Sequence, residues 1–382
     1  MAGELKILIV TDKFKGSLSA LEAAESIKKG LLLGYARLEI RILPMADGGE
    51  GTIDVIMNSS GGELKYAEVY DPLFRLISAP YLIKGNKVFI EMAKCSGLQL
   101  LKRREYNPLR TSTYGLGQMI LAASAGDTAT KICIGIGGSA TNDGGMGMLK
   151  ALGYKFTDNK GEDAATPWNV KEIDDKGVSP VLKRIRFEVA CDVNNPLLGV
   201  RGATAVYGPQ KGANKKMLEE LEQGMRNYAK VCERFLGKSY ADYPGAGAAG
   251  GVGFALTGFL GAQLIPGWKV LSDLTYLESL VKGSDIIITG EGSIDEQSVS
   301  GKLISGVAEI AKKYSKSVWA YCGVNSLNEN QLKRAGIERV FAISDIESKR
   351  EKSVREAKKY LEKISFKSAT FLNHFQSNRQ TY

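Results

Sequence analysis

Short apolar runs alternate with helical patterns at both ends of the chain. Residues 6–10 and 38–43 have the length and composition of strands, and residues 19–33 repeat apolar positions with a helical period after a serine cap. Alternating strands and helices are typical of a parallel sheet that helices cover on both faces. The C-terminal third shows the same alternation, with strands at 285–289, 317–321 and 339–343 and helices at 303–314, 328–335 and beyond residue 349.

The middle of the chain has a different pattern. From residue 67 to residue 93, extended segments are broken at Asp71-Pro72, at Pro80 and at 84–86, which are hairpin signals. A chain of 382 residues also exceeds what one hydrophobic core usually serves. We therefore predict an α/β protein of two domains. The first is a parallel α/β domain formed by residues 1–67 and 284–382, and the second is a mixed α/β domain inserted as residues 68–283.

The net charge of +9 raises the question of nucleic-acid binding. The last 34 residues supply +6 of this charge, as nine Lys and Arg against three Glu, and the basic residues line the polar face of a predicted helix. No zinc-finger or RRM signature occurs, and no apolar run approaches the ~18 residues of a membrane span. We expect neither a nucleic acid nor a membrane as a partner, and a monomer or a homodimer.

The cysteines and the single histidine limit the possible chemistry. Five scattered cysteines without a C-x-x-C pair fit reduced thiols in a cytoplasmic protein better than a zinc site. The N-terminus, MAGELKILIV, lacks the basic start and long apolar core of a signal peptide, so we expect a cytoplasmic location. With only His374, near the C-terminus, catalysis by a histidine base is not expected.

Four stretches combine glycine with small polar or acidic residues. The richest, IGIGGSATNDGGMGML at 134–149, holds six glycines and lies between a strand-like run and a helical one. Such a loop lets the backbone approach a ligand, and it offers N–H groups at a helix start to phosphate or carboxylate. A tight turn is the alternative for a single loop, and Asp143 or Asn142 could simply cap the helix. The other three stretches lie at 47–52, 245–251 and 290–295.

The glycine patterns leave more than one reaction open. Gly135-x-Gly137-x-x-Ala140 and residues 245–250 match the dinucleotide fingerprint weakly, which keeps a nicotinamide-dependent oxidoreductase of a small hydroxy acid as an alternative. A non-catalytic anion-binding protein is a second alternative. Acidic residues beside the glycines favour a third, Mg²⁺-assisted phosphoryl transfer, because a cation must separate carboxylates from phosphate. These acids are Asp47, Glu50, Asp143, Asp192, Glu291 and Asp295.

Nine motifs, in the same order along the chain, resemble those of the bacterial glycerate kinases. They span residues 5 to about 325. The motifs are IGIGGSATNDGGMGMLKALG (134–153), DKFKGSLSA (12–20), MADGGEGT (45–52), IEMAKCSGLQLL (90–101), NPLRTSTYGLG (107–117), CDVNNPLLGVRGA (191–203), YGPQKGA (207–213), PGAGAAGGVGFAL (244–256) and TGEGSIDEQSVSGK (289–302).

The resemblance implies a Rossmann-like domain from both chain ends, an inserted domain and an active site in the cleft between them. It also implies a reaction that moves the γ-phosphate of ATP to glycerate with Mg²⁺. Members similar to this chain generally give 2-phosphoglycerate. The chain departs from the family pattern at three places. It has Thr11-Asp12-Lys13 where the family usually has Pro-Asp-Ser, and Phe74 where the family has a glycine. Near Ser293 the family usually has an Arg-like residue.

Residue roles follow as hypotheses. Lys15, with the main chain of Gly16 and Ser17 at the first helix start, is the candidate for the glycerate carboxylate. Asp192 follows a strand-like run and is the candidate base on the acceptor hydroxyl or a Mg²⁺ ligand, unless it serves only in a turn.

The remaining candidates divide between substrate, metal and nucleotide. Asp47, Glu50 and Glu291 are assigned to the substrate, Asp295 to substrate or metal, and Lys302 to compensation of phosphate charge as a catalytic residue. The ATP-phosphate candidates are Gly137, Gly138, Ser139, Thr141, Asn142, Gly247 and Gly250, with Lys211 as a further one.

Overall fold

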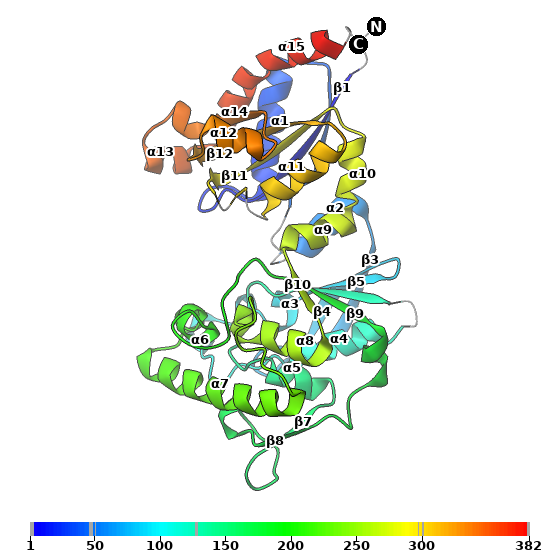
Figure 1. Ribbon diagram of the computed structural model, residues 1–382, viewed down its shortest axis with the longest axis vertical. Coiled ribbons are helices and arrows are strands. Elements are labelled where there is room, and N and C mark those ends of the chain that lie inside the picture. Colours follow the sequence, from blue (N-terminus) through cyan, green and yellow to red (C-terminus); the bar gives the residue numbers. More distant parts are fainter. Residues whose placement is uncertain are drawn as a thin grey trace. The chain divides into compact units, whose positions relative to one another are not determined.

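The computed structural model describes residues 4–45, 49, 51–126, 129–296, 298–299 and 302–379. The chain divides into two compact units (Figure 1). The terminal unit comprises Met1–Ala46 and Leu271–Tyr382, and the inserted unit comprises Asp47–Val270. These breaks fall earlier than the expected ones at 67/68 and 283/284. The first does so because β3 (Glu63–Tyr70) pairs with β4 (Leu76–Lys84) of the inserted unit.

The terminal unit is built on a five-stranded sheet in which every pairing is parallel, in the order β13-β12-β11-β1-β2. Its interior strands are buried along most of their length, as strands covered on both faces are. The sheet confirms the α/β fold class and the five strands expected from the two chain ends. The strands are β1 (Leu5–Thr11), β2 (Leu38–Ile42), β11 (Ile286–Ile294), β12 (Ser317–Asn325) and β13 (Arg339–Ala342).

Helices cover both faces of this sheet. α1 (Ala20–Gly34) and α14 (Ala357–Ser368) pack together on one face, and their backbones approach so closely that a Cβ on Gly30 would lie 2.3 Å from the Glu362 carbonyl oxygen. The other face is covered by α11 (Leu303–Lys313) and α12 (Glu329–Arg334). The expected single C-terminal helix is instead three, α13 (Arg350–Arg355), α14 and α15 (Thr370–Arg379). The apolar stripe of this segment consists of Val354, Ala357, Leu361 and Ile364, and its last three residues are buried in α14.

The inserted unit contains a mixed six-stranded sheet in the order β10-β9-β6-β5-β4-β3. β3, β4 and β5 (Lys87–Glu91) are antiparallel neighbours, which confirms the hairpins expected between residues 67 and 93. β5, β6 (Lys131–Gly135), β9 (Arg186–Ala190) and β10 (Gln263–Ile265) run parallel, so the carboxyl ends of β6 and β9 meet at one edge. β7 (Lys155–Thr157) and β8 (Glu172–Asp174) form a separate hairpin.

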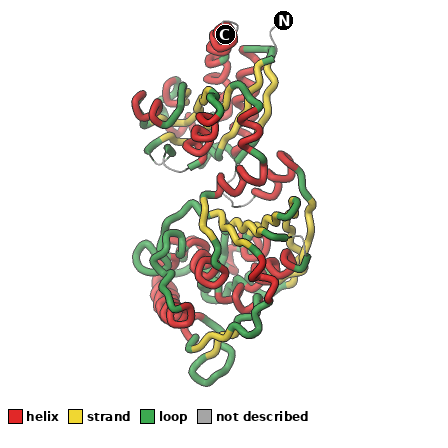
Figure 2. The backbone as a smooth tube through the Cα atoms, turned by 45° about the vertical axis from the view of Figure 1, so that its right-hand side comes forward, coloured by secondary structure: helices red, strands yellow, loops and turns green. Residues whose placement is uncertain are grey.

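Most of the remaining helices surround the mixed sheet, and Figure 2 shows them alternating with long loops. The longest, α7 (Lys215–Leu236), begins after the Asn214 cap and buries one apolar face. The other helices are α2 (Thr52–Ser60), α3 (Ala93–Ser96), α4 (Tyr114–Ser124), α5 (Met146–Ala151), α6 (Ala203–Tyr207) and α8 (Val252–Leu260). The break between the units falls within α9 (Gly267–Thr275), and α10 (Leu277–Lys282) belongs to the terminal unit.

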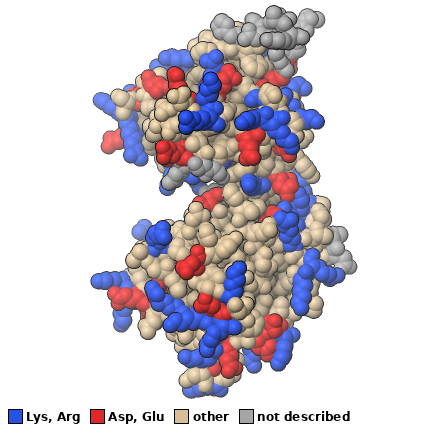
Figure 3. Space-filling model, in the orientation of Figure 1, with Lys and Arg blue, Asp and Glu red and all other residues tan. Residues whose placement is uncertain are grey.

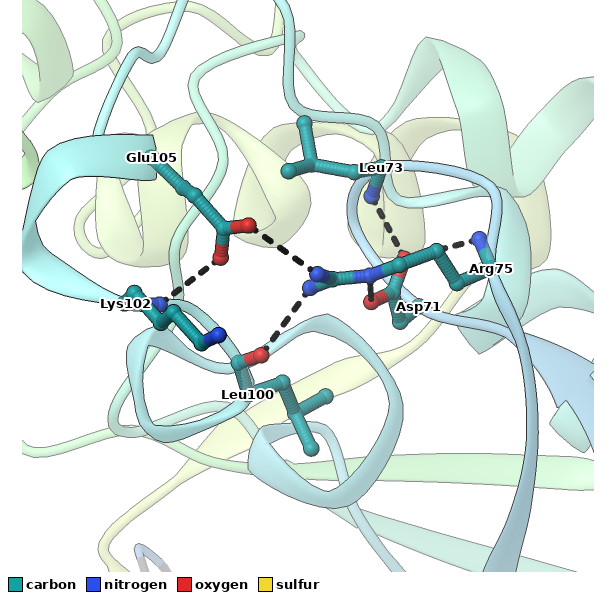
Figure 4. Close-up of polar contacts among 6 residues, drawn as sticks. All are labelled: Asp71, Leu73, Arg75, Leu100, Lys102 and Glu105. Carbon is teal, nitrogen blue, oxygen red and sulfur yellow. Dashed lines mark hydrogen bonds and ion pairs between the residues drawn. The ribbon is translucent and has the colours of Figure 1, made fainter.

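A buried aspartate fixes the turn between β3 and β4 and the loop that follows α3 (Figure 4). The Asp71 carboxylate accepts hydrogen bonds from the N–H groups of Leu73 and Arg75 and from the Arg75 guanidinium. The same guanidinium donates to the Leu100 carbonyl and to Glu105, each at 3.1 Å. This network therefore holds residues 98–105 in place beside the glycine-rich loop.

Surface charge and helix length relate to the expectation that neither a nucleic acid nor a membrane is a partner. On the face shown in Figure 3, lysine and arginine side chains are interspersed with aspartate and glutamate rather than gathered into one basic patch. Within the described part of the chain, no helix has both the length and the apolar composition that crossing a bilayer requires. All five cysteines are free thiols.

Candidate functional site

Many of the candidate residues line one of two pockets, and each unit contains one of these pockets. The glycine-loop pocket of the inserted unit has a volume of about 420 Å³, and its wall includes Gly137, Gly138, Ser139, Asp192, Tyr207 and Lys211. The lysine pocket of the terminal unit has a volume of about 700 Å³, and its wall includes Lys13, Lys15, Ser17, Glu291, Asp295 and Lys302.

The glycine-rich loop leaves β6 and places Gly137 and Gly138 at the surface of the first pocket. Gly138 adopts a left-handed conformation with φ of 72°, and its carbonyl accepts a hydrogen bond from the Leu98 N–H. A Cβ on Gly137 would lie 2.8 Å from the Cα of Gly49, so a larger residue there would displace the neighbouring backbone. The loop thus exposes bare main chain to the pocket.

The N–H groups at the helix start behind this loop are bonded to a carboxylate of the protein, that of Asp143. α5 begins after Gly145, and the N–H groups of Gly145 and Gly147 donate to Asp143 at 3.1 and 3.2 Å. Burial raises the pKa of Asp143, and the hydrogen bonds from Thr113, Gly145 and Gly147 counteract that rise. The Asp143 carboxylate therefore accepts from the first N–H groups of α5, which is the role that the capping alternative gave it, although Gly145 is the residue at the N-cap position.

Two of the predicted phosphate ligands do not reach the pocket. Thr141 and Asn142 are 0% and 1% exposed, and neither lines the glycine-loop pocket. Asn142 donates its amide to Thr204 and borders a separate cavity of about 140 Å³. Thr141 Oγ1 and Asn142 Oδ1 have no hydrogen-bond partner among the described residues. These side chains lie behind the loop rather than on its ligand-facing side.

The second glycine stretch packs against the first. A Cβ on Gly247 would lie 2.2 Å from the Pro196 carbonyl oxygen, and one on Gly250 would lie 2.1 Å from that of Thr141. The Gly250 carbonyl also accepts from the Gly144 N–H. The two glycines therefore allow backbone to pack against backbone, while their neighbours Ala248 and Ala249 line the pocket.

Neither glycine stretch has the context of a dinucleotide fingerprint. The fingerprint needs a strand, a tight turn and a helix whose first turn faces the pyrophosphate. After β6 the chain runs for ten residues before the six-residue helix α5, and the stretch around Gly247 contains only a short 3₁₀ turn. The oxidoreductase alternative therefore loses the feature on which it depended.

Lys211 is the most deeply buried charged side chain of the pocket wall, at 1% exposure. Its amine donates to Ser139 Oγ at 2.9 Å and to the Thr141 carbonyl at 2.6 Å. Burial lowers the pKa of Lys211 to about 7, and Asp143 acts in the opposite direction. Sequence reasoning ranked this lysine among the last candidates, because a single lysine in a Gly-Pro turn carries no periodic signal of burial.

Asp192 lies just beyond the carboxyl end of β9, as the sequence predicted. The residue is exposed at the pocket, and one carboxylate oxygen accepts a hydrogen bond from the Gly267 N–H at 3.1 Å. β9 neighbours β6 in the sheet, so Asp192 and the glycine loop leave the same sheet edge.

The lysine pocket begins with the loop after β1. Gly16 has φ of 82°, and both the N–H and the hydroxyl of Ser17 donate to the Phe14 carbonyl. The helix starts only at Ala20, where Ser19 and Glu22 cap each other's backbone. The expectation that Gly16 and Ser17 form the helix start is wrong, and the exposed Lys15 is the group that this loop offers to an anion.

Acidic groups face the lysines of this pocket. Burial raises the pKa of Glu291, whereas a hydrogen bond from Ser298 and the nearby charge of Lys302 lower it. Asp295 accepts hydrogen bonds from the N–H and the hydroxyl of Ser298 at 3.0 and 3.2 Å. Lys13 and Ser293, where the chain departs from the family pattern, line the same pocket.

The metal assignment concerns Asp192 and Asp295, which belong to different units. Among the described residues, no three His, Cys, Asp or Glu side chains are grouped to hold a metal ion. Mg²⁺ commonly uses one or two carboxylates together with phosphate oxygens and water. The neighbouring carboxylates of Glu291 and Asp295 fit that donor set. Asp47 and Glu50 lie outside the described residues.

Comparison with known proteins gives a consistent assignment. A model of the glycerate kinase family matches residues 7–373. The chain is 42% identical over 368 residues to a glycerate kinase of Bacillus subtilis, covering 94% of this chain and 96% of the relative. It is 42% identical to the glycerate 2-kinase of Escherichia coli, covering 89% and 90%.

A solved structure agrees with the sequence matches. A crystal structure of a protein assigned as glycerate kinase 2 from Salmonella typhimurium LT2 is 38% identical to this chain. It superposes with a TM-score of 0.80 over 98% of this chain and 100% of that one. The chain belongs to the glycerate kinase family.

Proposed function

We propose that the protein transfers the γ-phosphate of ATP to glycerate with the help of Mg²⁺ and forms mainly 2-phosphoglycerate. The observation that carries this proposal is the family match over residues 7–373, together with relatives named glycerate kinase and glycerate 2-kinase. Both pockets contain groups that anionic ligands need. The glycine-loop pocket offers exposed glycine backbone and a buried lysine, and the lysine pocket offers several lysines.

The glycine-loop pocket is our candidate for the nucleotide phosphates. The exposed main chain of Gly137 and Gly138 lets phosphate oxygens approach backbone N–H groups, and Ser139 and Lys211 add a hydroxyl and an amine. Four further predicted residues act from behind by supporting the loop, since they do not line the pocket: Thr141, Asn142, Gly247 and Gly250.

The lysine pocket is our candidate for glycerate. Lys15 would bind the carboxylate beside Ser17, and Glu291 and Asp295 would accept hydrogen bonds from the hydroxyls. Lys302 would compensate phosphate charge. The carboxylates of Glu291 and Asp295 are also the groups that would hold Mg²⁺, which neutralises charge on the phosphate oxygens when bound.

Asp192 is our candidate for the catalytic base, with a role as Mg²⁺ ligand as the alternative. The base accepts the proton of the acceptor hydroxyl while the hydroxyl oxygen forms a bond to the γ-phosphorus. The bond between the γ-phosphorus and the bridging oxygen of ADP breaks, and ADP leaves with its electrons. Phosphoryl transfer asks mainly for positioning and charge compensation, so a chain with a single histidine can perform it.

A coupled assay of ADP release tests the proposal. Purified protein is incubated with ATP, Mg²⁺ and glycerate, and in parallel with tartronate and other small hydroxy acids. We expect glycerate-dependent ADP release that stops when EDTA removes Mg²⁺, and a product that enolase accepts directly. Absence of ADP release with every hydroxy acid, or an enhancement of NADH fluorescence on binding, would contradict the proposal.

A further inference from the structure

The amine of Lys211 has one more donor than the protein satisfies. A lysine ammonium carries three N–H donors, and two of them bond to Ser139 Oγ and to the Thr141 carbonyl. Both partners are neutral. Among the described residues no ion pair involves this amine, although the side chain is 1% exposed and lines the glycine-loop pocket. An uncompensated buried cation is costly unless a ligand supplies the missing charge.

The neighbouring titratable groups do not supply that charge directly. Asp143 raises the pKa of Lys211, but its carboxylate is already bonded to Thr113, Gly145 and Gly147. Cys191 and Tyr207 line the same pocket, and burial raises the pKa of both, so they stay neutral near pH 7. Asp192 also lines it and accepts a hydrogen bond from Gly267.

We propose that Lys211 is a proton-linked anion-binding residue, whose amine binds an anionic oxygen of the ligand in the glycine-loop pocket and takes up a proton on binding. The inference rests on the proposed function, because we assign the anion to a phosphate of the nucleotide. A glycerate carboxylate offers the same chemistry, so the experiment must separate the two ligands.

The direction of the proton linkage follows from burial. In the free protein, burial lowers the pKa of Lys211 to about 7, so that the amine is largely neutral at pH 8. An anion in contact with the amine favours the ammonium form and raises the pKa again. Binding at pH 8 therefore takes up close to one proton, and binding at pH 6 takes up almost none.

Isothermal titration calorimetry measures this uptake. Titrations at pH 8 in two buffers of different ionisation enthalpy give the number of protons exchanged, with an unreactive ATP analogue in one arm and glycerate in the other. The γ-phosphate is largely ionised at pH 8, so the ligand itself contributes little to the number of protons exchanged. At pH 8 we expect uptake close to one proton in the nucleotide arm and none in the glycerate arm.

Other results have distinct meanings. Uptake only in the glycerate arm would place the carboxylate on Lys211 and overturn the assignment of this pocket to the nucleotide. Nucleotide binding without proton uptake at pH 8, with no uptake in the glycerate arm either, would overturn the inference about Lys211. The proposed kinase activity is tested separately, by the assay of ADP release.

Variants sharpen the test. Lys211→Met removes the charge with little change in length, so it should abolish the proton uptake and weaken nucleotide binding about 10- to 100-fold. Lys215→Met is the matched control, because Lys215 is an exposed lysine four residues away that does not line the pocket. Both variants should first show cooperative unfolding.

A measurement on the unmodified protein covers the case in which Lys211→Met does not fold. If only the ammonium form binds, affinity for the nucleotide analogue should fall about tenfold per pH unit above pH 8. A flat affinity between pH 8 and pH 9.5 would overturn the inference, because a lysine with only a structural role gives no such slope.

Discussion

The carboxylate of Asp143 holds Thr113 at two points, accepting hydrogen bonds from its backbone N–H and from its hydroxyl, each at 2.8 Å. The Thr113 hydroxyl oxygen in turn accepts from the Met148 N–H at 2.8 Å. Since Thr113 precedes α4 and Asp143 precedes α5, this pair joins the starts of two helices beneath the glycine-rich loop.

Replacing Asp143 by alanine should destabilise the inserted unit. The change leaves the buried N–H groups of Thr113, Gly145 and Gly147 without a partner, and each unsatisfied group costs about 1–3 kcal/mol. We expect a loss of at least about 3 kcal/mol in the free energy of unfolding, measured with urea.

Asp163→Ala is the control for this change. Asp163 forms an ion pair with Lys150 at 2.8 Å, but its side chain is 69% exposed, so its removal should cost less than about 1 kcal/mol. Equal losses for the two variants would contradict the structural role that we assign to Asp143.

Gly250 and Gly261 separate steric crowding from backbone strain. Both have positive φ, of 72° and 62°, so alanine at either position costs about 1 kcal/mol through the backbone alone. A Cβ at Gly261 would meet nothing within 4 Å, whereas at Gly250 it would lie 2.1 Å from the Thr141 carbonyl oxygen. Gly250→Ala should therefore lose about 3 kcal/mol or more, and thermal unfolding of both variants checks the difference.

The fold was largely predictable because its signals are local. Strand-length apolar runs gave the strands of the parallel sheet, the serine before α1 marked its start, and the Asp71-Pro72 and 84–86 turns marked the hairpins. The break of the C-terminal helix at Glu356 was not predictable, because the apolar stripe continues across it and helical packing against α1 decides the outcome.

The site was predictable only in part. Strand ends placed Asp192, Glu291 and the glycine loop correctly at the pocket walls. Sequence spacing could not show that Thr141 and Asn142 turn away from the pocket. These orientations depend on contacts between residues far apart in the chain, such as the bond from Asn142 to Thr204.

Asp192→Asn tests the proposed base. Asparagine keeps an oxygen that can accept the hydrogen bond from the Gly267 N–H, so the fold should survive, but it cannot take a proton. We expect kcat to fall about 100-fold or more in the ADP-release assay. Asp242→Asn, at an exposed position outside the pocket, should leave kcat unchanged. A kcat of Asp192→Asn within a few-fold of the unmodified enzyme would remove Asp192 from the chemistry.

Phe74 allows the cost of an unfavourable backbone conformation to be measured. It is a non-glycine residue with φ of 61°, and its ring contacts those of Tyr70 and Tyr114 at centroid distances of 5.8 Å. Phe74→Gly and Phe74→Ala both lose the ring, but only glycine removes the backbone strain of the positive φ. The glycine variant should be more stable than the alanine variant by about 1 kcal/mol in urea unfolding. The reverse order would show that the turn is not left-handed in solution.

The pH dependence of stability gives an independent measure of the buried amine of Lys211. Its pKa is about 7 in the folded protein, whereas a lysine in the unfolded chain has its ordinary value of 10.5. Below pH 7 the amine is charged in both states, and the full cost of burying the charge is present. Between pH 7 and pH 10.5 the folded protein releases the proton and the unfolded chain keeps it, so that stability rises with pH.

Lys211→Met lacks this titration, so the two proteins should diverge as the pH rises. Relative to the variant, the unmodified protein should gain about 2 kcal/mol in the free energy of unfolding between pH 7 and pH 9. Subtracting the variant removes contributions from groups that titrate in both proteins, such as the buried cysteines. Urea unfolding at pH 7, 8 and 9 measures the difference. Parallel stability profiles would mean that water or a counter-ion reaches the amine and keeps it charged, because a lysine in contact with solvent retains its ordinary pKa.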